Sequence, residues 1–270
     1  MSAMRKENNE NVLANIIFPV RPTILLKFQQ AQEQGADIAQ ITELISQDIS
    51  LSAALLKTIN SAEYGLSENI RSIKQAVTLL GIKQISTLVT GLSLQKISGN
   101  LDVDTLCSHS VEIASTSVFI ARQLGGINVD DAQLCGLFHE CGKVLLYRQF
   151  DDYLDTLNKA NDLGQSVVGF ERYLYGTDHC FVGALLSHAW SLPATVTAVI
   201  RHHHAVKAFR DGDLLDHVLT LLALNHLAEY LTSHKYNEWS LYGCEFMEYL
   251  KITKNDLTNF QSQVNQRLMH

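Results

Sequence analysis

The amino-acid sequence predicts an all-α protein. Only three prolines occur in 270 residues, so little interrupts long helices after residue 22. Apolar residues recur at three- and four-residue intervals through most of the chain, which is the spacing of one helix face. Alternating apolar and polar runs, the pattern of half-buried strands, are scarce. We therefore expect an N-terminal helical bundle packed on a second helical domain.

Composition and charge narrow the classes of function. The net charge is −7 and no block of lysine and arginine stands out, which disfavours a nucleic-acid partner. No apolar run approaches the roughly 18 residues needed to cross a bilayer, and the polar N-terminus lacks the apolar core of a signal peptide. The five cysteines include no CxxC pair, so a structural zinc knot or a disulfide framework is not expected. We therefore expect a cytoplasmic protein without membrane association.

The first hundred residues divide into a tail and a bundle. Residues 1–14 are polar and predict a flexible tail, and residues 15–100 predict the N-terminal helical bundle. Within it, the apolar spacing predicts two helices that break just before Ser50, which can cap the second of them. Ser72 can cap a further helix that stops at Gly81, and another apolar stripe follows.

The rest of the chain repeats the helical pattern. Residues 101–235 predict a second helical domain, and residues 236–270 a C-terminal helical extension. The expected helices of the second domain cover roughly 104–124, 131–147, 151–163, 166–174, 178–190, 193–204 and 213–233.

Polar residues fall on the apolar stripes of five of these helices. They are His109, His139, His179, His203 and Asn225. One histidine on an apolar face is usually a satisfied core residue, but five helices can converge on a common site. Glu140, beside the second histidine, adds a carboxylate, and histidine with carboxylate suits zinc, iron or manganese. Spacing alone leaves a shared site and a set of core residues both open.

The other histidines carry no comparable argument. His202 and His204 flank the stripe residue of a three-histidine run, and a run at a helix end is often exposed. We expect ordinary surface or half-buried roles for the rest, namely His188, His217, His226 and His234.

Spaced motifs then carry a resemblance to a known family. They are LISQDISLSAALLKTINSA (44–62), IRSIKQAVTLLG (70–81), LFHECGK (137–143) and GTDHCFVGA (176–184). In this order they resemble the HDOD family of bacterial signalling domains, with Ile49 where that family usually has proline. The resemblance covers roughly residues 15–230. It implies that residues 101–235 form a helical domain like that of the HD superfamily of metal-dependent phosphohydrolases.

The superfamily's metal-ligand pattern H…HD…D carries over with two changes. Its histidines fall on His109 and His139, the aspartate of the pair becomes Glu140, and the last aspartate falls, more loosely, on Asn225. His179 and His203 are similar in position to the additional histidine ligands of its cyclic-dinucleotide branch. The resemblance therefore implies a degenerate site able to hold a single divalent transition metal (Fe, Mn, Zn or Ni) rather than two metals. Ala205-Val206-Lys207 stands where the "GYP" loop of that branch would follow.

Two functions follow from this resemblance. The first is a stand-alone, non-catalytic signal-transduction module that binds a signalling protein partner. The alternative is a metal-dependent phosphohydrolase acting on a nucleotide or cyclic dinucleotide, with Glu140 at the metal and Lys143 steadying a phosphate oxygen. The simpler interpretation of Lys143 is a surface lysine. A DNA-docking helix pair in the first half is disfavoured by the acidic charge.

Overall fold

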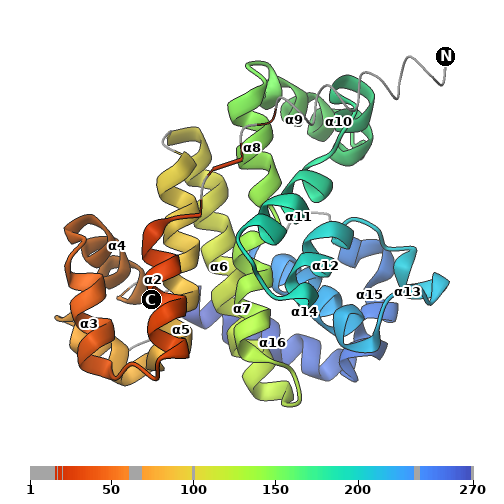
Figure 1. Cartoon of the computed structure of the whole chain (residues 1–270). Coiled ribbons are helices and arrows are strands. Elements are labelled where there is room, and N and C mark those ends of the chain that lie inside the picture. The colour runs from red at the N-terminus through yellow and green to blue at the C-terminus, as the bar shows by residue number, and fades with distance from the viewer. Residues whose placement is uncertain are drawn as a thin grey trace.

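The computed structural model describes residues 16, 18–19, 21–60, 69–98, 101–233 and 238–268, with side chains left out at 94–98, 101–108, 208, 211, 233 and 268. Every regular element in these ranges is a helix, which confirms the all-α prediction (Figure 1). The expected tail at 1–14 lies outside the described residues, as do the last residues of the 44–62 motif.

The N-terminal lobe, at the left of Figure 1, consists of α2 (Thr23–Glu33), α3 (Ile38–Ser46), α4 (Ile49–Ile59) and α5 (Ile73–Ser98). The break between α3 and α4 lies where the apolar spacing placed it. Its cap differs, because the side chain of Asp48, not Ser50, accepts the backbone N–H of Leu51 at 2.9 Å. Asp48 takes this role because it stands one residue before the first helical turn, where an acceptor can reach the free N–H groups.

Helix α5 is bent where the sequence predicted an end. Ser72 Oγ accepts the N–H of Gln75 at 3.2 Å, as expected of a cap. At Gly81 the backbone has φ 81° and ψ 159°, a conformation that favours glycine, and the helix then resumes. Within the described part of the chain, Ile73–Ser93 is the one stretch long and apolar enough to cross a membrane by length and composition. The fold buries 56% of its most apolar window, and Gly81 interrupts it, so this segment is a core helix of the bundle.

The second half supplies eleven helices of the described chain. They are α6 (Leu101–Leu124), α7 (Val129–Phe138), α8 (Cys141–Gln149), α9 (Tyr153–Asp162), α10 (Val167–Tyr175), α11 (His179–Ala189), α12 (Ala194–His202), α13 (Ala208–Asp211), α14 (Asp216–Ser233), α15 (Glu238–Leu250) and α16 (Lys254–Leu268). The single helix expected at 131–147 is wrong. The chain leaves the helix at His139–Glu140, so α7 and α8 are separate, although the apolar spacing continues across the break.

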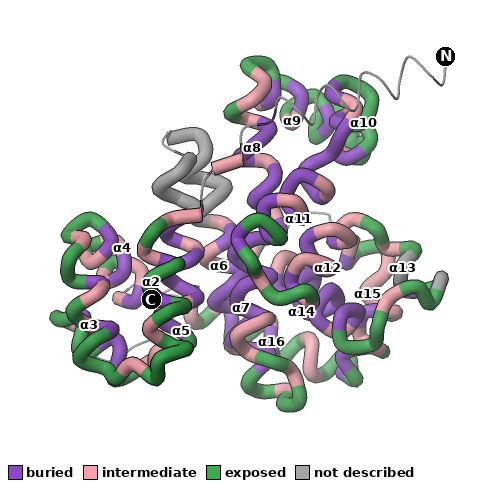
Figure 2. Tube along the Cα trace, viewed as in Figure 1, coloured by how far each residue is buried: buried purple, intermediate pink, exposed green. Residues whose placement is uncertain are grey.

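One apolar core joins these helices. A single cluster of buried side chains extends from Ile16 to Val264, and α5 packs against α6, α7 and α8 (Figure 2). The N-terminal lobe therefore rests on the second half, as the sequence predicted. Helices α8, α11, α12 and α14 lie together in the second half. The ends of α7, α8, α11 and α12 carry polar residues that are discussed next.

Candidate metal centre

Helix ends bring the predicted polar residues together. His139 closes α7, and Glu140 immediately precedes α8. His179 is the first residue of α11, and His203 with His204 follows the last turn of α12. Side chains at these helix ends can point across the junction where the helices meet.

Gly142 allows the first turn of α8 to meet the first turn of α11. A Cβ atom at this position would lie 1.9 Å from the carbonyl oxygen of His179 and 2.8 Å from the backbone nitrogen of Gly183. Only a residue without a side chain fits there, so α8 and α11 pack backbone against backbone. This close approach places the carboxylate of Glu140 beside the ring of His179.

The resulting cluster contains Glu140, His179, His203 and His204, whose ligand atoms all lie within 4.8 Å of one another. Glu140 Oε2 is 3.4 Å from His179 Nε2 and 3.8 Å from His203 Nε2. The two Nε2 atoms are 3.2 Å apart. Ligands bound to one transition metal at roughly 2.0–2.2 Å stand at such mutual distances.

Backbone carbonyls set the orientation of two histidines. His139 Nδ1 donates to the carbonyl of Gly136 at 2.9 Å, and His203 Nδ1 donates to that of Ile200 at 2.8 Å. Because a carbonyl accepts only from N–H, the proton is on Nδ1 and the Nε2 lone pair is bare. His139 Nε2 is buried and has no hydrogen-bond partner among the residues that the structure describes. This is how metal-binding histidines are held before the metal arrives.

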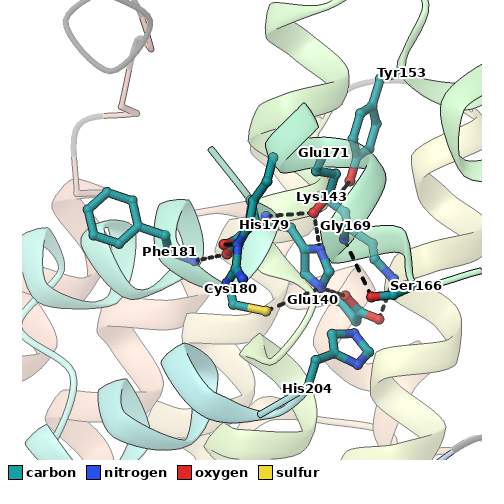
Figure 3. A network of polar contacts seen from close by, with 12 residues as sticks. Glu140, Lys143, Tyr153, Ser166, Gly169, Glu171, His179, Cys180, Phe181 and His204 are labelled. Atoms are coloured by element: carbon teal, nitrogen blue, oxygen red, sulfur yellow. Dashed lines mark hydrogen bonds and ion pairs between the residues drawn. The ribbon is translucent and has the colours of Figure 1, made fainter. Parts of the chain in front are cut away.

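A buried carboxylate orients His179 in the same way. Glu171 Oε2 accepts from His179 Nδ1 at 2.7 Å and from its backbone N–H at 3.0 Å, and Tyr153 donates to Glu171 Oε1 at 2.5 Å (Figure 3). Figure 3 shows the ring of His179 between Glu171 and Glu140. The bare Nε2 atoms of His179 and His203 therefore face each other, a repulsive arrangement that a bound cation relieves. These donors fit a metal.

The ionisation states favour metal binding. Burial lowers the pKa of His139 to about 4, and it lowers the pKa of His179 and of His203 as well, so the rings are neutral at pH 7. Burial by itself would raise the pKa of Glu140. The ammonium of Lys143, 2.5 Å away, opposes burial and helps to hold that pKa well below its usual range. His139, His179 and His203 thus offer neutral imidazoles, and Glu140 offers one anionic oxygen. His204 differs, because its hydrogen bond to Glu238 opposes the effect of burial and its pKa is raised.

Three site residues differ from what the sequence led us to expect. The side chain of Lys143 is only 13% exposed, so the surface-lysine interpretation is wrong. His204 lies in the cluster because the chain turns after α12, and a helical stripe does not extend past that turn. Glu171 was not singled out, although it lies on the buried stripe of α10 with Val168 and Tyr175. A glutamate on such a stripe was the available signal.

His109 and Asn225 lie apart from the group of four. His109, on α6, is half-buried, and burial followed by the charge of His139 lowers its pKa. Asn225, on α14, is 2% exposed, and its Oδ1 has no hydrogen-bond partner within the described ranges. An amide oxygen can serve as a neutral ligand. A metal-binding role for these two residues stays a prediction.

Comparison with known proteins identifies the family. The model of the HDOD domain matches residues 18–206. An HDOD domain protein from Geobacter sulfurreducens has the same fold, with a TM-score of 0.72, 20% identity and 99% of each chain covered. A candidate metal-dependent phosphohydrolase from Shewanella amazonensis SB2B gives a TM-score of 0.64 at 19% identity, over 97% of this chain and 99% of that one.

A curated relative from Treponema pallidum (strain Nichols) is 27% identical over 193 residues, 69% of this chain. The chain spans little more than a third of that relative, 37% of its length. The structural likenesses, at 20% identity or less, show the fold alone. The family model matches well over half of the residues, and the chain belongs to the HDOD domain family.

Proposed function

We propose that this chain is a non-catalytic signal-transduction module in which one divalent transition metal is held by Glu140, His179 and His203, with His139 and His204 beside them. The observation that carries the proposal is a closed set of metal-facing atoms. His139, His179 and His203 are 1%, 0% and 2% exposed. Glu140 Oε2 is buried and, in the part of the chain that the structure describes, has no hydrogen-bond partner.

The burial of these ligands from solvent argues for a structural or regulatory metal. Catalytic metal sites keep a position open for water and substrate, whereas structural sites are closed by protein ligands. Here the side chain of Glu140, the most accessible member of the first three ligands, is 11% exposed. A phosphodiester has to reach the metal to be cleaved, and buried ligands do not give it that access.

The charge of the site supports a single metal. Glu140 is the one carboxylate in the group of four, and Lys143 already pairs with it. The position that the resemblance assigns to a second carboxylate carries the neutral Asn225. Histidine with one carboxylate suits iron, manganese, zinc or nickel. Such an ion would join the ends of α8, α11 and α12 and so fix the surface offered to a signalling protein partner in the cytoplasm.

The alternative is a metal-dependent phosphohydrolase acting on a nucleotide or cyclic dinucleotide. Lys143 favours it, because its ammonium lies at the site, 2.5 Å from Glu140 Oε1, where a phosphate oxygen could replace the carboxylate. The name of the Shewanella neighbour points the same way.

Bound metal is the first measurement. Untagged protein would be analysed by plasma mass spectrometry beside His139→Ala and the matched control His188→Ala, which alters an exposed histidine on α11. After gel filtration in buffer with a weak chelator, which removes loosely held ions, we expect the wild type and the control to keep a transition metal that His139→Ala loses. The metal-loaded wild type is expected not to hydrolyse cyclic dinucleotides or bis-p-nitrophenyl phosphate.

Two results would contradict the proposal in different ways. Turnover that disappears in His139→Ala would establish the phosphohydrolase instead. If every correctly folded sample is free of metal, both the metal-holding signalling module and the phosphohydrolase are excluded. The next experiment would then be the identification of protein partners.

A further inference from the structure

We propose that His226, Glu229 and Glu238 form a second divalent-cation site, separate from the centre at Glu140. The proposal goes beyond the function proposed above and does not depend on it. His226 and Glu229 stand one helical turn apart on α14, and Glu238 begins α15, which packs against α14. The three residues offer ligand atoms that all lie within 4.8 Å of one another.

The imidazole of His226 is the observation that distinguishes this cluster from ordinary acidic neighbours. His226 is 2% exposed, and its Nδ1 has no hydrogen-bond partner in the described residues. That nitrogen lies 3.8 Å from Glu229 Oε2, too far for a hydrogen bond but suitable for two ligands of one ion. A buried polar atom without a hydrogen-bond partner destabilises the folded state, and a cation at this place would remove that cost.

Packing holds the ring in this position. The imidazole of His226 stacks on Phe246 with ring centroids 4.7 Å apart and planes 8° from parallel. The ring is therefore fixed from α15 while Glu229 and Glu238 stand at its edge. The expectation that His226 is an ordinary surface or half-buried histidine is wrong.

Charge favours a divalent ion. The two carboxylates bring two negative charges, which a divalent cation neutralises. Burial would raise the pKa of Glu229, but His226 outweighs it and the pKa lies below the ordinary value, which keeps the carboxylate anionic at pH 7. The side chains of Glu229 and Glu238 are 20% and 23% exposed, which gives an ion a path from solvent. One nitrogen and two oxygen donors suit manganese, zinc or iron.

Glu238 links this cluster to the first centre. Its Oε1 accepts from His204 Nδ1 at 2.5 Å, which leaves its other oxygen for the cation. All three residues lie beyond the segment 18–206 that the family model matches, in the C-terminal part of the chain. The second site therefore lies on α14 and α15, outside the matched segment.

The experiment counts metal ions in the full chain. Protein freed of metal by a strong chelator would be incubated with Mn²⁺ or Zn²⁺, passed through gel filtration and analysed by plasma mass spectrometry, with calorimetric titration for affinity. Glu229→Gln keeps shape and removes charge, and it leaves the His204–Glu238 contact in place. His226→Phe keeps a ring against Phe246 but removes the nitrogen. Glu248→Gln, an exposed carboxylate on α15, is the matched control.

We expect the wild type and Glu248→Gln to bind one ion more than Glu229→Gln and His226→Phe. His179→Ala, which alters the first centre, is expected to keep the ion that those two variants lose. The same metal content in the wild type, Glu229→Gln and His226→Phe overturns the second site, whatever the first centre binds. A single ion in the wild type that is lost in Glu229→Gln but kept in His179→Ala supports the second site and contradicts the first.

Discussion

Glu171 acts on the candidate centre through His179. Three hydrogen bonds converge on its carboxylate, two from His179 and one from Tyr153. Burial raises the pKa of Glu171 to about 7, so keeping this carboxyl group in the core has a free-energy cost. The carboxylate fixes the ring of His179, keeps the proton on Nδ1 and directs Nε2 at Glu140. Carboxylate partners of this kind also make a histidine a better ligand.

Replacing Glu171 with glutamine therefore separates metal binding from stability. Glu171→Gln removes the charge behind His179, and we expect metal affinity to fall by roughly 10- to 100-fold. The metal-free variant is expected to be at least as stable as the wild type, because the cost of burying an ionisable group disappears. Competition with a chromophoric chelator at pH 7.5 measures affinity, and urea unfolding in EDTA measures stability.

Tyr153→Phe is the companion variant. It removes the phenol that donates to Glu171 Oε1 and leaves both contacts with His179, so its loss of affinity should be smaller. Unchanged metal affinity of the first centre in Glu171→Gln, under conditions in which His179→Ala leaves that centre empty, would show that Glu171 does not position the ligand.

Helix periodicity was a good guide to single elements and a poor one to their junctions. The break before α4, the cap at Ser72 and the bend at Gly81 follow local chemistry that a single sequence records. The break at His139–Glu140 does not. Apolar residues continue across it with helical spacing, and the chain turns because Gly142 lets α8 pack on α11, a contact between segments distant in sequence.

The residues of the candidate site show the same difference between local patterns, which the sequence records, and contacts between distant segments, which it does not. His179 and His203 were found because both lie on apolar stripes and match a motif. His204 and Glu238 were missed because their contact joins residues 34 positions apart, after a turn that periodicity does not describe. Glu171 lay on a stripe, but a glutamate on a helical stripe gives no sign that its partner is a histidine on the next helix.

Gly142 provides a test at the level of helix pairs. Gly142→Ala would place a methyl group 1.9 Å from the carbonyl oxygen of His179, so α8 and α11 must separate. We expect a loss of stability of at least about 1–3 kcal/mol, which is typical of overpacking, and a loss of bound metal. Gly169→Ala on α10 is the control, because its Cβ meets only Ser166 at 3.8 Å and alanine favours a helix by up to about 1 kcal/mol. Equal melting temperatures for the two variants would contradict the close approach.

In the whole molecule, one core couples the centre to global unfolding. Buried apolar side chains are continuous from the N-terminal lobe to α16, so protonating a buried residue has to be accommodated by the entire fold. His139, His179 and His203 have pKa values lowered by burial, and Glu171 has one raised by burial. A lowered histidine pKa makes the folded state less stable as the pH falls, and a raised glutamate pKa makes it less stable as the pH rises. Three histidines act in the first direction and one glutamate in the second, so we expect the loss in acid to be larger.

Metal-free protein is therefore expected to lose stability in acid. The unfolded chain binds a proton at His139 near pH 6.5, whereas the native state does so only near pH 4. Between these values the unfolded state holds more protons, so the free energy of unfolding falls as the pH falls, by about 3 kcal/mol for His139 over the full interval. Urea unfolding in EDTA at pH 7, 6 and 5 would show the decline, and His139→Gln should make it shallower by up to about 1.4 kcal/mol per pH unit. The same slope in both proteins would mean that His139 is protonated in the native state at these pH values, and the closed, neutral centre would then be wrong.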